Sequence, residues 1–281
     1  MNFTKMHGIG NDFILINCLD SNGESLRSEA RDRSIELCDR KFGIGADGII
    51  LILPGSSTEF RMQMFNPDGS EAEMCGNGIR CFANYLYEND LVPDFSNLNI
   101  ETGAGTLIVK PELDGAKFTG RVTVDMGPPI LDPKLIPTTL GTASVINEPL
   151  ELLDRTVSVT AISMGNPHAV VFVETVENYP VQLIGQQVEN HGSFPNRTNT
   201  EFIEVLSRRE MNFRVWERGA GETLACGTGA CASVVASSLN GLTDRDVTVH
   251  LRGGDLQIRW SESDNHVYMT GAAETVYTGA I

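Results

Sequence analysis

The sequence predicts a mixed α/β (α+β) protein of two pseudo-symmetric domains, each mostly β-strand with one central helix. The first observation behind this prediction is an internal repeat. Residues 62–81 (MQMFNPDGSEAEMCGNGIRC) recur as residues 213–231 (FRVWERGAGETLACGTGAC), at an offset of 151 positions (226 − 75). The second is that strand patterns around these segments recur in the same order. A chain of 281 residues is long enough for two such domains with separate cores.

Each copy of the repeat joins an alternating apolar run, typical of a strand, to a polar loop and then to Cys-Gly-x-Gly and a helix-like segment. The aligned pairs are Cys75 and Cys226, Gly76 and Gly227, Asn77 and Thr228, Gly78 and Gly229, and Asn66 and Glu217. Each thiol is expected at a helix N-terminus, where free backbone N–H groups and the helix dipole favour a thiolate and bind carboxylates. Two such units facing one substrate would supply the opposed acid and base that inverting a stereocentre requires.

The first half of the chain is expected to begin with two strands in residues 1–18, joined by the polar turn HGIGNDF. An amphipathic helix is predicted for residues 28–40. A tight Gly-rich loop then precedes a strand at 49–53; because its GxGxxG pattern comes before a strand, a dinucleotide site is rejected. The elements predicted after that are a helix at 79–89 and strands at 98–101, 106–110 and 120–126.

The second half is expected to repeat the first. Residues 127–150 are the only loose stretch, with five prolines. The later elements predicted are strands at 157–164 and 169–173, a helical or irregular stretch to 195, a strand at 202–206, a helix ending near 240, a hairpin at 247–252 and 255–260, and a strand at 267–270. The turn GNPH resembles the turn HGIGNDF, which aligns Asn166 with Asn11. The 151-residue offset aligns Asn199 with Gly48. The predicted domains are residues 1–126 and 127–269, with the tail 270–281 packing back on the first.

Composition excludes some functions. A formal net charge of −16 and a pI near 4.7 argue against binding nucleic acid or an anionic membrane. No apolar stretch is long enough to span a membrane and the N-terminus has no signal-peptide core, so a cytoplasmic location is expected. Disulfides are then not expected. The cysteines outside the two aligned thiol positions, Cys18, Cys38, Cys81 and Cys231, are predicted to be buried packing residues.

Metal and redox sites are the alternatives for the cysteines. Five and four residues separate the cysteines within the two motifs, which does not match paired zinc knuckles, and a CxxC motif is absent. We therefore expect no metal. His168 and His7 are either structural or near the site, and the sequence leaves this open. The pair Glu217–Arg218 is either a surface ion pair or a clamp for a substrate ammonium and carboxylate.

The motifs MHGIGNDF, FNPDGSEAEMCGNGIRC, SMGNPHAV, WERGAGETLACGTGAC and MTGAA resemble those of diaminopimelate epimerase, a family of pyridoxal-phosphate-independent amino-acid epimerases. The resemblance spans nearly the whole chain. It implies two β-barrel-like domains, each around a central helix, with the active site in the cleft between them. It also implies a homodimer and a small amino-acid substrate.

By this resemblance, Cys75 and Cys226 are the proton donor and acceptor that convert LL-2,6-diaminopimelate to the meso isomer, with the roles exchanged in reverse. The substrate-binding residues implied are Asn11, Asn66, Gly76, Asn77, Asn166, Asn199, Glu217, Arg218, Gly227 and Thr228. Many members carry Gln where this chain has Gly48, so that side chain's hydrogen bond must be absent or replaced. No lysine lies in either motif unit, so no cofactor is expected.

The nearest alternative enzyme is a proline racemase or hydroxyproline epimerase, which shares the two-thiol logic. It differs at the far end of the substrate, because diaminopimelate carries a second amino-carboxylate that needs its own polar contacts. A non-catalytic amino-acid-binding protein is the alternative outside enzymes. Two thiols at equivalent positions argue against it.

Overall fold

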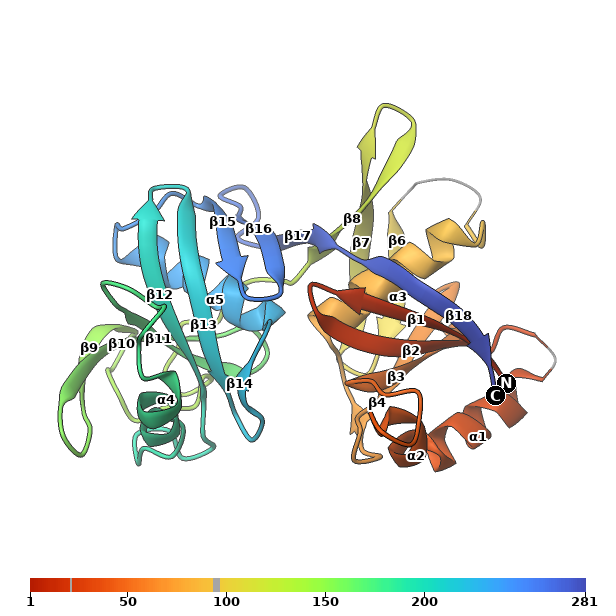
Figure 1. Cartoon of the computed structure of the whole chain (residues 1–281). Helices are drawn as coiled ribbons and strands as arrows, with labels where there is room; N and C mark the ends of the chain where they lie inside the picture. Colours follow the sequence, from red (N-terminus) through yellow and green to blue (C-terminus); the bar gives the residue numbers. More distant parts are fainter. Residues whose placement is uncertain (21, 93–96) are drawn as a thin grey trace. The chain divides into compact units, whose positions relative to one another are not determined.

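The computed structural model describes residues 1–20, 22–92 and 97–281. The chain forms two compact units, an N-terminal unit of Met1–Asp125 with Thr270–Ile281 and a C-terminal unit of Met126–Met269. Both are strand-rich with few helices, as predicted (Figure 1). None of the helices in the described part of the chain is long and apolar enough to cross a membrane.

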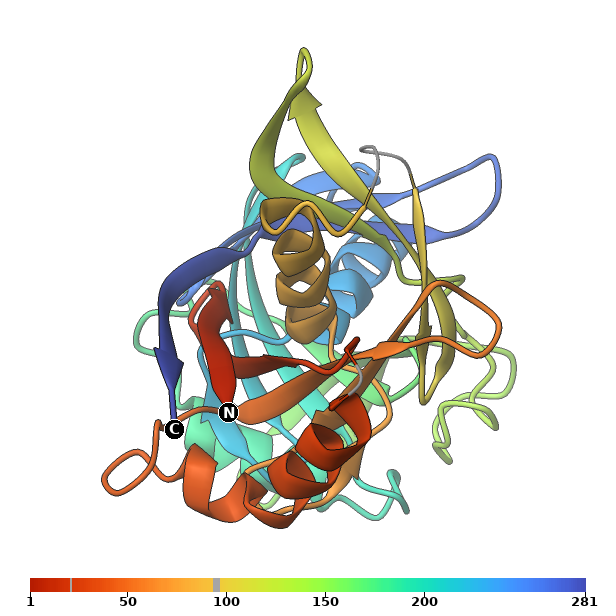
Figure 2. The same cartoon turned by 90° about the vertical axis from the view of Figure 1, so that its right-hand side faces the viewer.

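The N-terminal unit consists of β1 (Asn2–Gly8), β2 (Asn11–Asn17), α1 (Gly23–Asp32), α2 (Ser34–Cys38), β3 (Gly48–Pro54), β4 (Phe60–Phe65), β5 (Glu71–Ala72), α3 (Gly76–Glu88), β6 (Leu98–Thr102), β7 (Gly105–Asp114), β8 (Lys117–Asp125) and β18 (Glu274–Ala280). Its strands pair in the order β18-β1-β2-β3-β4-β6-β7-β8, parallel for β2–β3 and β4–β6 and otherwise antiparallel. The chain ends lie side by side, with the Ile281 amide donating to the Met1 carbonyl at 3.0 Å (Figure 2).

The C-terminal unit consists of β9 (Val145–Glu151), β10 (Thr156–Ser163), β11 (Pro167–Phe172), α4 (Val181–Glu189), β12 (Asn199–Ser207), β13 (Glu210–Glu217), β14 (Gly221–Thr223), α5 (Gly227–Leu239), β15 (Asp246–Leu251) and β16 (Gly254–Trp260), and β17 (Val267–Ala272) spans the boundary between the units. Its strands pair in the order β9-β10-β11-β12-β13-β15-β16, parallel for β11–β12 and β13–β15.

The two units repeat one topology. In each, a hairpin is followed by a parallel partner strand, a further antiparallel strand, a short strand, a 13-residue helix and a second hairpin. The register of the parallel pairs agrees as well, because Phe13 lies opposite Gly48 in the first unit and His168 opposite Asn199 in the second. The predicted duplication of the fold is therefore confirmed, down to the pairing of individual residues.

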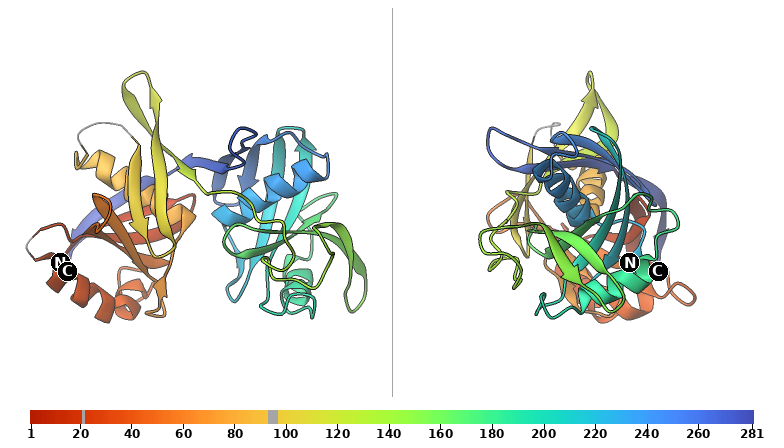
Figure 3. Two further views of the ribbon diagram at one scale, coloured as in Figure 1. Left: turned by 180° about the vertical axis from the view of Figure 1, so that it is seen from behind. Right: turned by 90° about the vertical axis from the view of Figure 1, so that its left-hand side faces the viewer.

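Each sheet curves around its long helix. Helix α3 contacts β1, β2 and β3 at one end of the strand order and β7 and β8 near the other, while α5 contacts β10, β11, β12, β15 and β16 in the same manner. Figure 3 shows α5 lying along the strands of its own unit. A sheet can meet one helix from both ends only if it is strongly curved, which gives the barrel-like form that was predicted.

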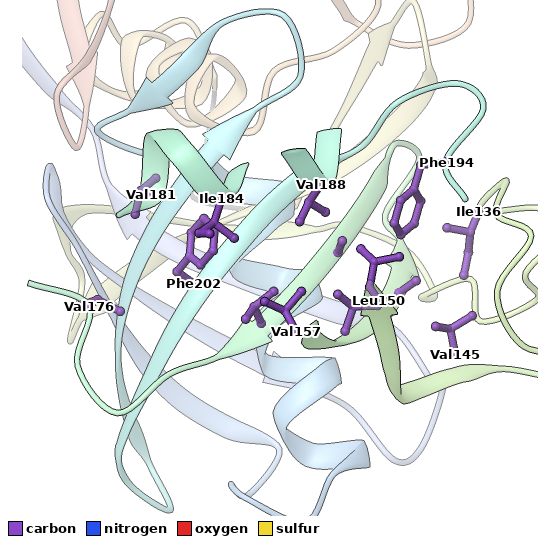
Figure 4. Close-up of a cluster of buried hydrophobic side chains, with 14 residues drawn as sticks. Ile136, Val145, Leu150, Val157, Val176, Val181, Ile184, Val188, Phe194 and Phe202 are labelled. Atoms are coloured by element: carbon purple, nitrogen blue, oxygen red, sulfur yellow. The ribbon is translucent and has the colours of Figure 1, made fainter. Parts of the chain in front are cut away.

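The other face of each sheet is covered by shorter helices. In the C-terminal unit, Val181, Ile184 and Val188 of α4 pack over Phe202 and the neighbouring strands (Figure 4). Burying such a side chain contributes about 1.5–3 kcal/mol, so this cluster anchors α4 to the sheet. In the N-terminal unit, Ala30 of α1 and Leu37 of α2 pack in the equivalent layer against β2 and β3.

Two element predictions need correction. The single helix predicted for residues 28–40 is wrong, because the backbone leaves helical geometry at Arg33 (φ −103°, ψ 9°) between α1 and α2. This break shifts the helical phase, so that Leu37 is buried while Ile35 stays 63% exposed. The stretch 127–150 is not loose throughout, since β9 begins at Val145. Its Pro149 is tolerated because this strand pairs with β10 at an edge of the order, where an N–H donor can be missing.

Candidate active site

Cys75 is the N-cap residue of α3, with extended backbone (φ −142°, ψ 118°), as the sequence predicted. Its Sγ accepts the Gly78 backbone N–H at 3.5 Å and the side chain is partly exposed. A β-carbon at Gly78 would lie 3.7 Å from this sulfur and 2.9 Å from the Ile50 side chain. The Cys-Gly-x-Gly pattern thus places a thiol against the helix N-terminus, with the second glycine leaving room for it.

Polar side chains hold the surroundings of Cys75 in place. Asn11 Oδ1 lies 3.8 Å from the Cys75 sulfur and accepts a hydrogen bond from Asn77 Nδ2 at 3.1 Å. Asn11 Nδ2 in turn donates to Asp47 Oδ2 at 2.7 Å. The fully buried Arg80 donates to Asn77 Oδ1 at 2.9 Å. The structure therefore brings Asn11, Asn77 and Cys75 together as predicted, and adds Asp47 and Arg80, which sequence reasoning missed.

The other predicted residues of the N-terminal unit lie at the start of α3 or at the ends of strands. Gly76 opens α3, and its carbonyl accepts from Arg80 Nη1 at 3.1 Å. Asn66 follows β4, where its side chain donates to Ser70 Oγ at 2.9 Å. Gly48 has no room for a side chain, because a β-carbon would lie 2.8 Å from the Phe65 carbonyl oxygen. A glutamine at this position therefore could not be accommodated without moving the backbone.

Cys226 is the N-cap residue of α5, again as predicted, and is only 6% exposed. Its Sγ lies 3.6 Å from Thr228 Oγ1, and Gly227 opens the helix. The Gly229 backbone N–H at the start of the helix lowers the pKa of this thiol, as expected, but larger effects oppose it. Burial, followed by the charges of Glu217 and Glu201, raises the pKa of Cys226 well above its ordinary value. Desolvation and two carboxylates outweigh the helix end.

Glu217 and Arg218 lie at the end of β13 in front of this thiol. Burial raises the pKa of Glu217, against the hydrogen bonds from Thr223 and Cys226. The Arg218 backbone N–H donates to Asn199 Oδ1 at 2.9 Å, and Asn199 Nδ2 donates to the Pro167 carbonyl at 3.0 Å. The two residues do not form an ion pair that the structure records. Instead, the Arg218 guanidinium is exposed and donates to the Asn196 carbonyl at 3.1 Å.

Asn166 belongs to a buried polar chain that the sequence did not predict. Its Oδ1 lies 2.9 Å from His168 Nε2, and His168 Nδ1 lies 2.7 Å from Glu201 Oε1. His168 and Glu201 are both 0% exposed. His168 thus lies beside Asn166, one of the predicted substrate-binding residues of the C-terminal unit. The signal that could have revealed Glu201 is a charged residue directly before the apolar residues Phe202 and Ile203 in the strand NTEFIEVLS.

Other cysteines and cavities lie apart from these groups. Cys18, Cys38, Cys81 and Cys231 are buried, as predicted, and burial raises the pKa of Cys81 to about 12. Within residues 1–20, 22–92 and 97–281, no cluster of three or more His, Cys, Asp or Glu side chains is arranged to hold a metal ion. A cavity of about 730 Å³ in the N-terminal unit is lined by the ends of β1, β2 and β18 and contains none of the predicted site residues.

The burial pattern predicts which thiol reacts first with an alkylating agent. Cys75 is the one cysteine of the six that is not buried, whereas Cys226 is enclosed and its pKa is raised. Because the thiolate is the reactive form, limited iodoacetamide treatment at neutral pH should label Cys75 at least about 10-fold faster than Cys226. Peptide mass spectrometry measures the two rates, and equal labelling would contradict the assigned environments.

Comparisons with known sequences identify a matching family. The family model described as "Diaminopimelate epimerase" matches residues 3–131 and 160–276. The diaminopimelate epimerase of Moorella thermoacetica is 54% identical over 281 residues, covering 99% of this chain and 98% of that relative. The one from Methanococcus maripaludis is 49% identical over 281 residues, covering 100% and 99%.

Solved structures show the same fold at low sequence identity. A Bacillus anthracis protein of the phenazine biosynthesis PhzF family aligns with a TM-score of 0.70 and 17% identity, covering 100% of this chain and 98% of its own. A hydroxyproline epimerase from Agrobacterium vitis, solved with bound trans-4-hydroxy-L-proline, aligns with a TM-score of 0.69 and 13% identity, covering 99% and 91%. At these identities the likeness extends to the fold alone.

Proposed function

The chain belongs to the diaminopimelate epimerase family and is an isomerase of that kind, and from this we propose that it interconverts LL- and meso-2,6-diaminopimelate by proton transfer between Cys75 and Cys226, without a cofactor. The observation that carries the mechanism is the placement of each thiol as the N-cap of the long helix of its unit. The reaction belongs to lysine biosynthesis and peptidoglycan-precursor supply.

The proposed reaction is balanced between the two thiols. The thiolate of one cysteine takes the α-proton from one face of the substrate, and the electrons of the broken C–H bond remain on the carbon. The S–H of the other cysteine then delivers its proton to the opposite face, which inverts the centre. The thiol and thiolate have exchanged places at the end, so the reverse reaction uses the same groups in opposite roles.

The developing negative charge needs stabilisation, since an amino acid's α-hydrogen is a weak acid. The free backbone N–H groups that begin α3 and α5, at Gly76–Gly78 and Gly227–Gly229, suit the α-carboxylate of the substrate. Glu217 suits its ammonium group. An ammonium beside Glu217 would offset one of the charges that raise the pKa of Cys226, so substrate binding would help this thiol to act as proton acceptor.

The second amino-carboxylate of diaminopimelate distinguishes this substrate from proline. We propose that Asn66, Asn166, Asn199 and Arg218 contact the substrate together with Asn11 and Asn77. The exposed Arg218 guanidinium is suited to a carboxylate. The alternative, a proline racemase or hydroxyproline epimerase, shares the fold with the Agrobacterium vitis enzyme. Identity of 54% over the full chain supports diaminopimelate instead.

We also propose that the enzyme works in the cytoplasm as a homodimer. Strand β18 pairs with β1 and leaves Val276 and Tyr277 exposed by 54% and 44%. Exposed apolar side chains on a strand near a sheet edge favour association with another chain. Sedimentation equilibrium should give twice the 30.6 kDa chain mass, and a single-chain mass at micromolar concentration would contradict the dimer.

Exchange of the α-proton in heavy water tests the function. The purified protein is incubated with LL-diaminopimelate or with L-proline, without added cofactor, and followed by NMR. Deuterium entering diaminopimelate, with the meso isomer appearing, is the expected result. Exchange into proline alone would replace the substrate while keeping the thiol pair, and exchange into neither would overturn the proposed reaction.

A further inference from the structure

The two units differ at one buried position beneath their thiols. In the N-terminal unit, Phe13 lies opposite Gly48, and Ile50 follows two residues later on β3. In the C-terminal unit, the register places His168 opposite Asn199, and Glu201 two residues later on β12. The pair Phe13 and Ile50 in one unit thus corresponds to His168 and Glu201 in the other.

The correspondence extends to the contact with the central helix. A β-carbon at Gly78 of α3 would lie 2.9 Å from Ile50 Cδ1. One at the equivalent Gly229 of α5 would lie 2.7 Å from Glu201 Oε1 and 3.2 Å from the Cys226 sulfur. Ile50 and Glu201 therefore occupy the same place under the two thiol-bearing helices, one as a hydrocarbon and the other as a carboxylate.

The stability of the fold does not explain why one unit has polar side chains where the other has hydrocarbon ones. Phe13, Ile50, His168 and Glu201 are all 0% exposed, so both versions are fully packed. Removing charges from water is costly, and well-packed apolar residues in place of a buried ion pair are often as stable or more stable. Because the apolar version packs in the sister unit, the charged version points to a role in the site.

The hydrogen bonds define the protonation of the imidazole. A carboxylate oxygen can only accept, so His168 Nδ1 donates to Glu201 Oε1 at 2.7 Å. The Asn166 carbonyl oxygen can also only accept, so Nε2 donates to it at 2.9 Å. If the ring donates on both sides, it carries two protons and forms an ion pair with Glu201. The Asn166 NH₂ group is left half-buried and makes no hydrogen bond that the described residues supply.

We propose that Glu201 is a positioning residue, which holds His168 as an imidazolium and thereby orients Asn166 with its NH₂ group toward a carboxylate of the substrate. The inference rests on the proposed function, in which Asn166 contacts the substrate. With a neutral imidazole protonated at Nδ1, Nε2 would need a donor, and the Asn166 amide would turn its carbonyl oxygen outward. The buried carboxylate thus selects a donor over an acceptor at this point of the site.

The pair also makes the two thiols chemically different. Glu201 contributes negative charge beside Cys226, where Glu217 and Thr228 are the other polar side chains. In the N-terminal unit, the place that corresponds to Glu201 under the helix is taken by Ile50. An epimerase acts on two opposite faces of one stereocentre, and this difference between the units matches that need.

The first test is Glu201→Gln, which keeps the size of the side chain and removes its charge. The imidazole should become neutral. The new amide can either accept from or donate to Nδ1, and only the tautomer that is protonated at Nε2 keeps the Asn166 carbonyl oxygen facing the ring. With the imidazolium lost as well, KM for diaminopimelate should rise by about 10-fold, with a smaller change in kcat. Since KM does not depend on the amount of folded enzyme, a purely structural defect would leave it unchanged.

NMR of the imidazole nitrogens gives a readout that needs no substrate. The chain has five histidines, and the His168 signal is identified by its loss in His168→Gln. At neutral pH the wild-type protein should show an imidazolium and Glu201→Gln a neutral ring. A neutral His168 in the wild type, or an unchanged KM in Glu201→Gln, would overturn the proposal. Failure of the wild type to act on diaminopimelate would instead overturn the proposed function.

Glu204→Gln is the matched control, because it makes the same change on the same strand. Glu204 accepts from the Val176 backbone N–H at 3.1 Å and from Asn212 Nδ2 at 3.2 Å, apart from the thiol. Its KM and its His168 signal should stay as in the wild type. A 10-fold rise in KM here as well would show that any lost charge on β12 has this effect, which would overturn the specific role of Glu201.

The second test copies the sister unit. The double variant His168→Phe with Glu201→Ile installs the apolar pair found at Phe13 and Ile50. It should fold with a Tm no lower than that of the wild type, yet lose at least about 10-fold in kcat/KM. Near-normal kcat/KM, or a large drop in Tm, would show that the pair serves packing and would overturn the proposal.

Discussion

Replacing either thiol is expected to abolish epimerisation. Cys75→Ala and Cys226→Ala should each lower kcat with LL-diaminopimelate by at least about 1,000-fold, since each removes a whole proton donor or acceptor. Neither remaining thiol can do both jobs, because one group cannot take a proton from one face and return it to the other. Both residues are N-caps, and alanine there costs only about 1 kcal/mol of stability.

Isotope exchange separates loss of inversion from loss of all chemistry. In heavy water, a variant with one thiol left should still exchange the α-proton of the isomer that this thiol faces, slowly and with retention. Cys81→Ala and Cys231→Ala are the matched controls, because these buried cysteines lie on the same two helices. Their turnover should stay close to normal. Near-normal turnover in Cys75→Ala or Cys226→Ala would rule out the two-base mechanism.

Gly229→Ala is expected to lower kcat by about 100-fold, because a small misplacement of reacting groups costs that much. The new methyl group would lie 2.7 Å from Glu201 Oε1 and 3.2 Å from the Cys226 sulfur. The carboxylate cannot simply move aside, since it is fully buried and bonded to His168 at 2.7 Å. The thiol or the first turn of α5 must therefore shift.

Gly229→Ala should lose much of its kcat but little of its thermal stability. Gly229 lies in the first turn of a helix, where alanine is ordinarily better than glycine by about 0.5–1 kcal/mol, and this gain offsets part of the clash. Steady-state kinetics and thermal unfolding measure the two effects. Gly192→Ala is the control, because nothing lies within 4 Å of a β-carbon at that position. Normal kcat in Gly229→Ala would show that the Cys226 position tolerates displacement.

The repeat made much of the fold predictable. Because the Cys-Gly-x-Gly segments follow an alternating strand at an offset of 151 positions, their placement at two helix N-termini could be predicted before the structure (226 − 75). Short-range rules govern such features: glycines, alternation and a cysteine before a helix are local signals. The hairpin pattern near Gly103 and its counterpart near Gly253 were predictable for the same reason.

Boundaries that depend on neighbours were less predictable. The break between α1 and α2 at Arg33 decides that Leu37 is buried and Ile35 is exposed, yet both fit one amphipathic pattern in the sequence. Strand β9 exists because β10 offers it a partner. Neither propensity nor periodicity contains that information, since the pairing energy comes from residues distant in the chain.

The sequence was sufficient to locate the two thiols, the asparagines and the pseudo-symmetry, since these depend on motifs read along the chain. The charge around the thiols depended on three-dimensional packing. Local rules favour a thiolate at Cys226, but burial and two carboxylates from other strands raise its pKa. Glu201 and His168 are 33 residues apart in the chain and meet because β11 and β12 pair in parallel. The electrostatic interaction between the two side chains is strong only after folding has excluded water from between them.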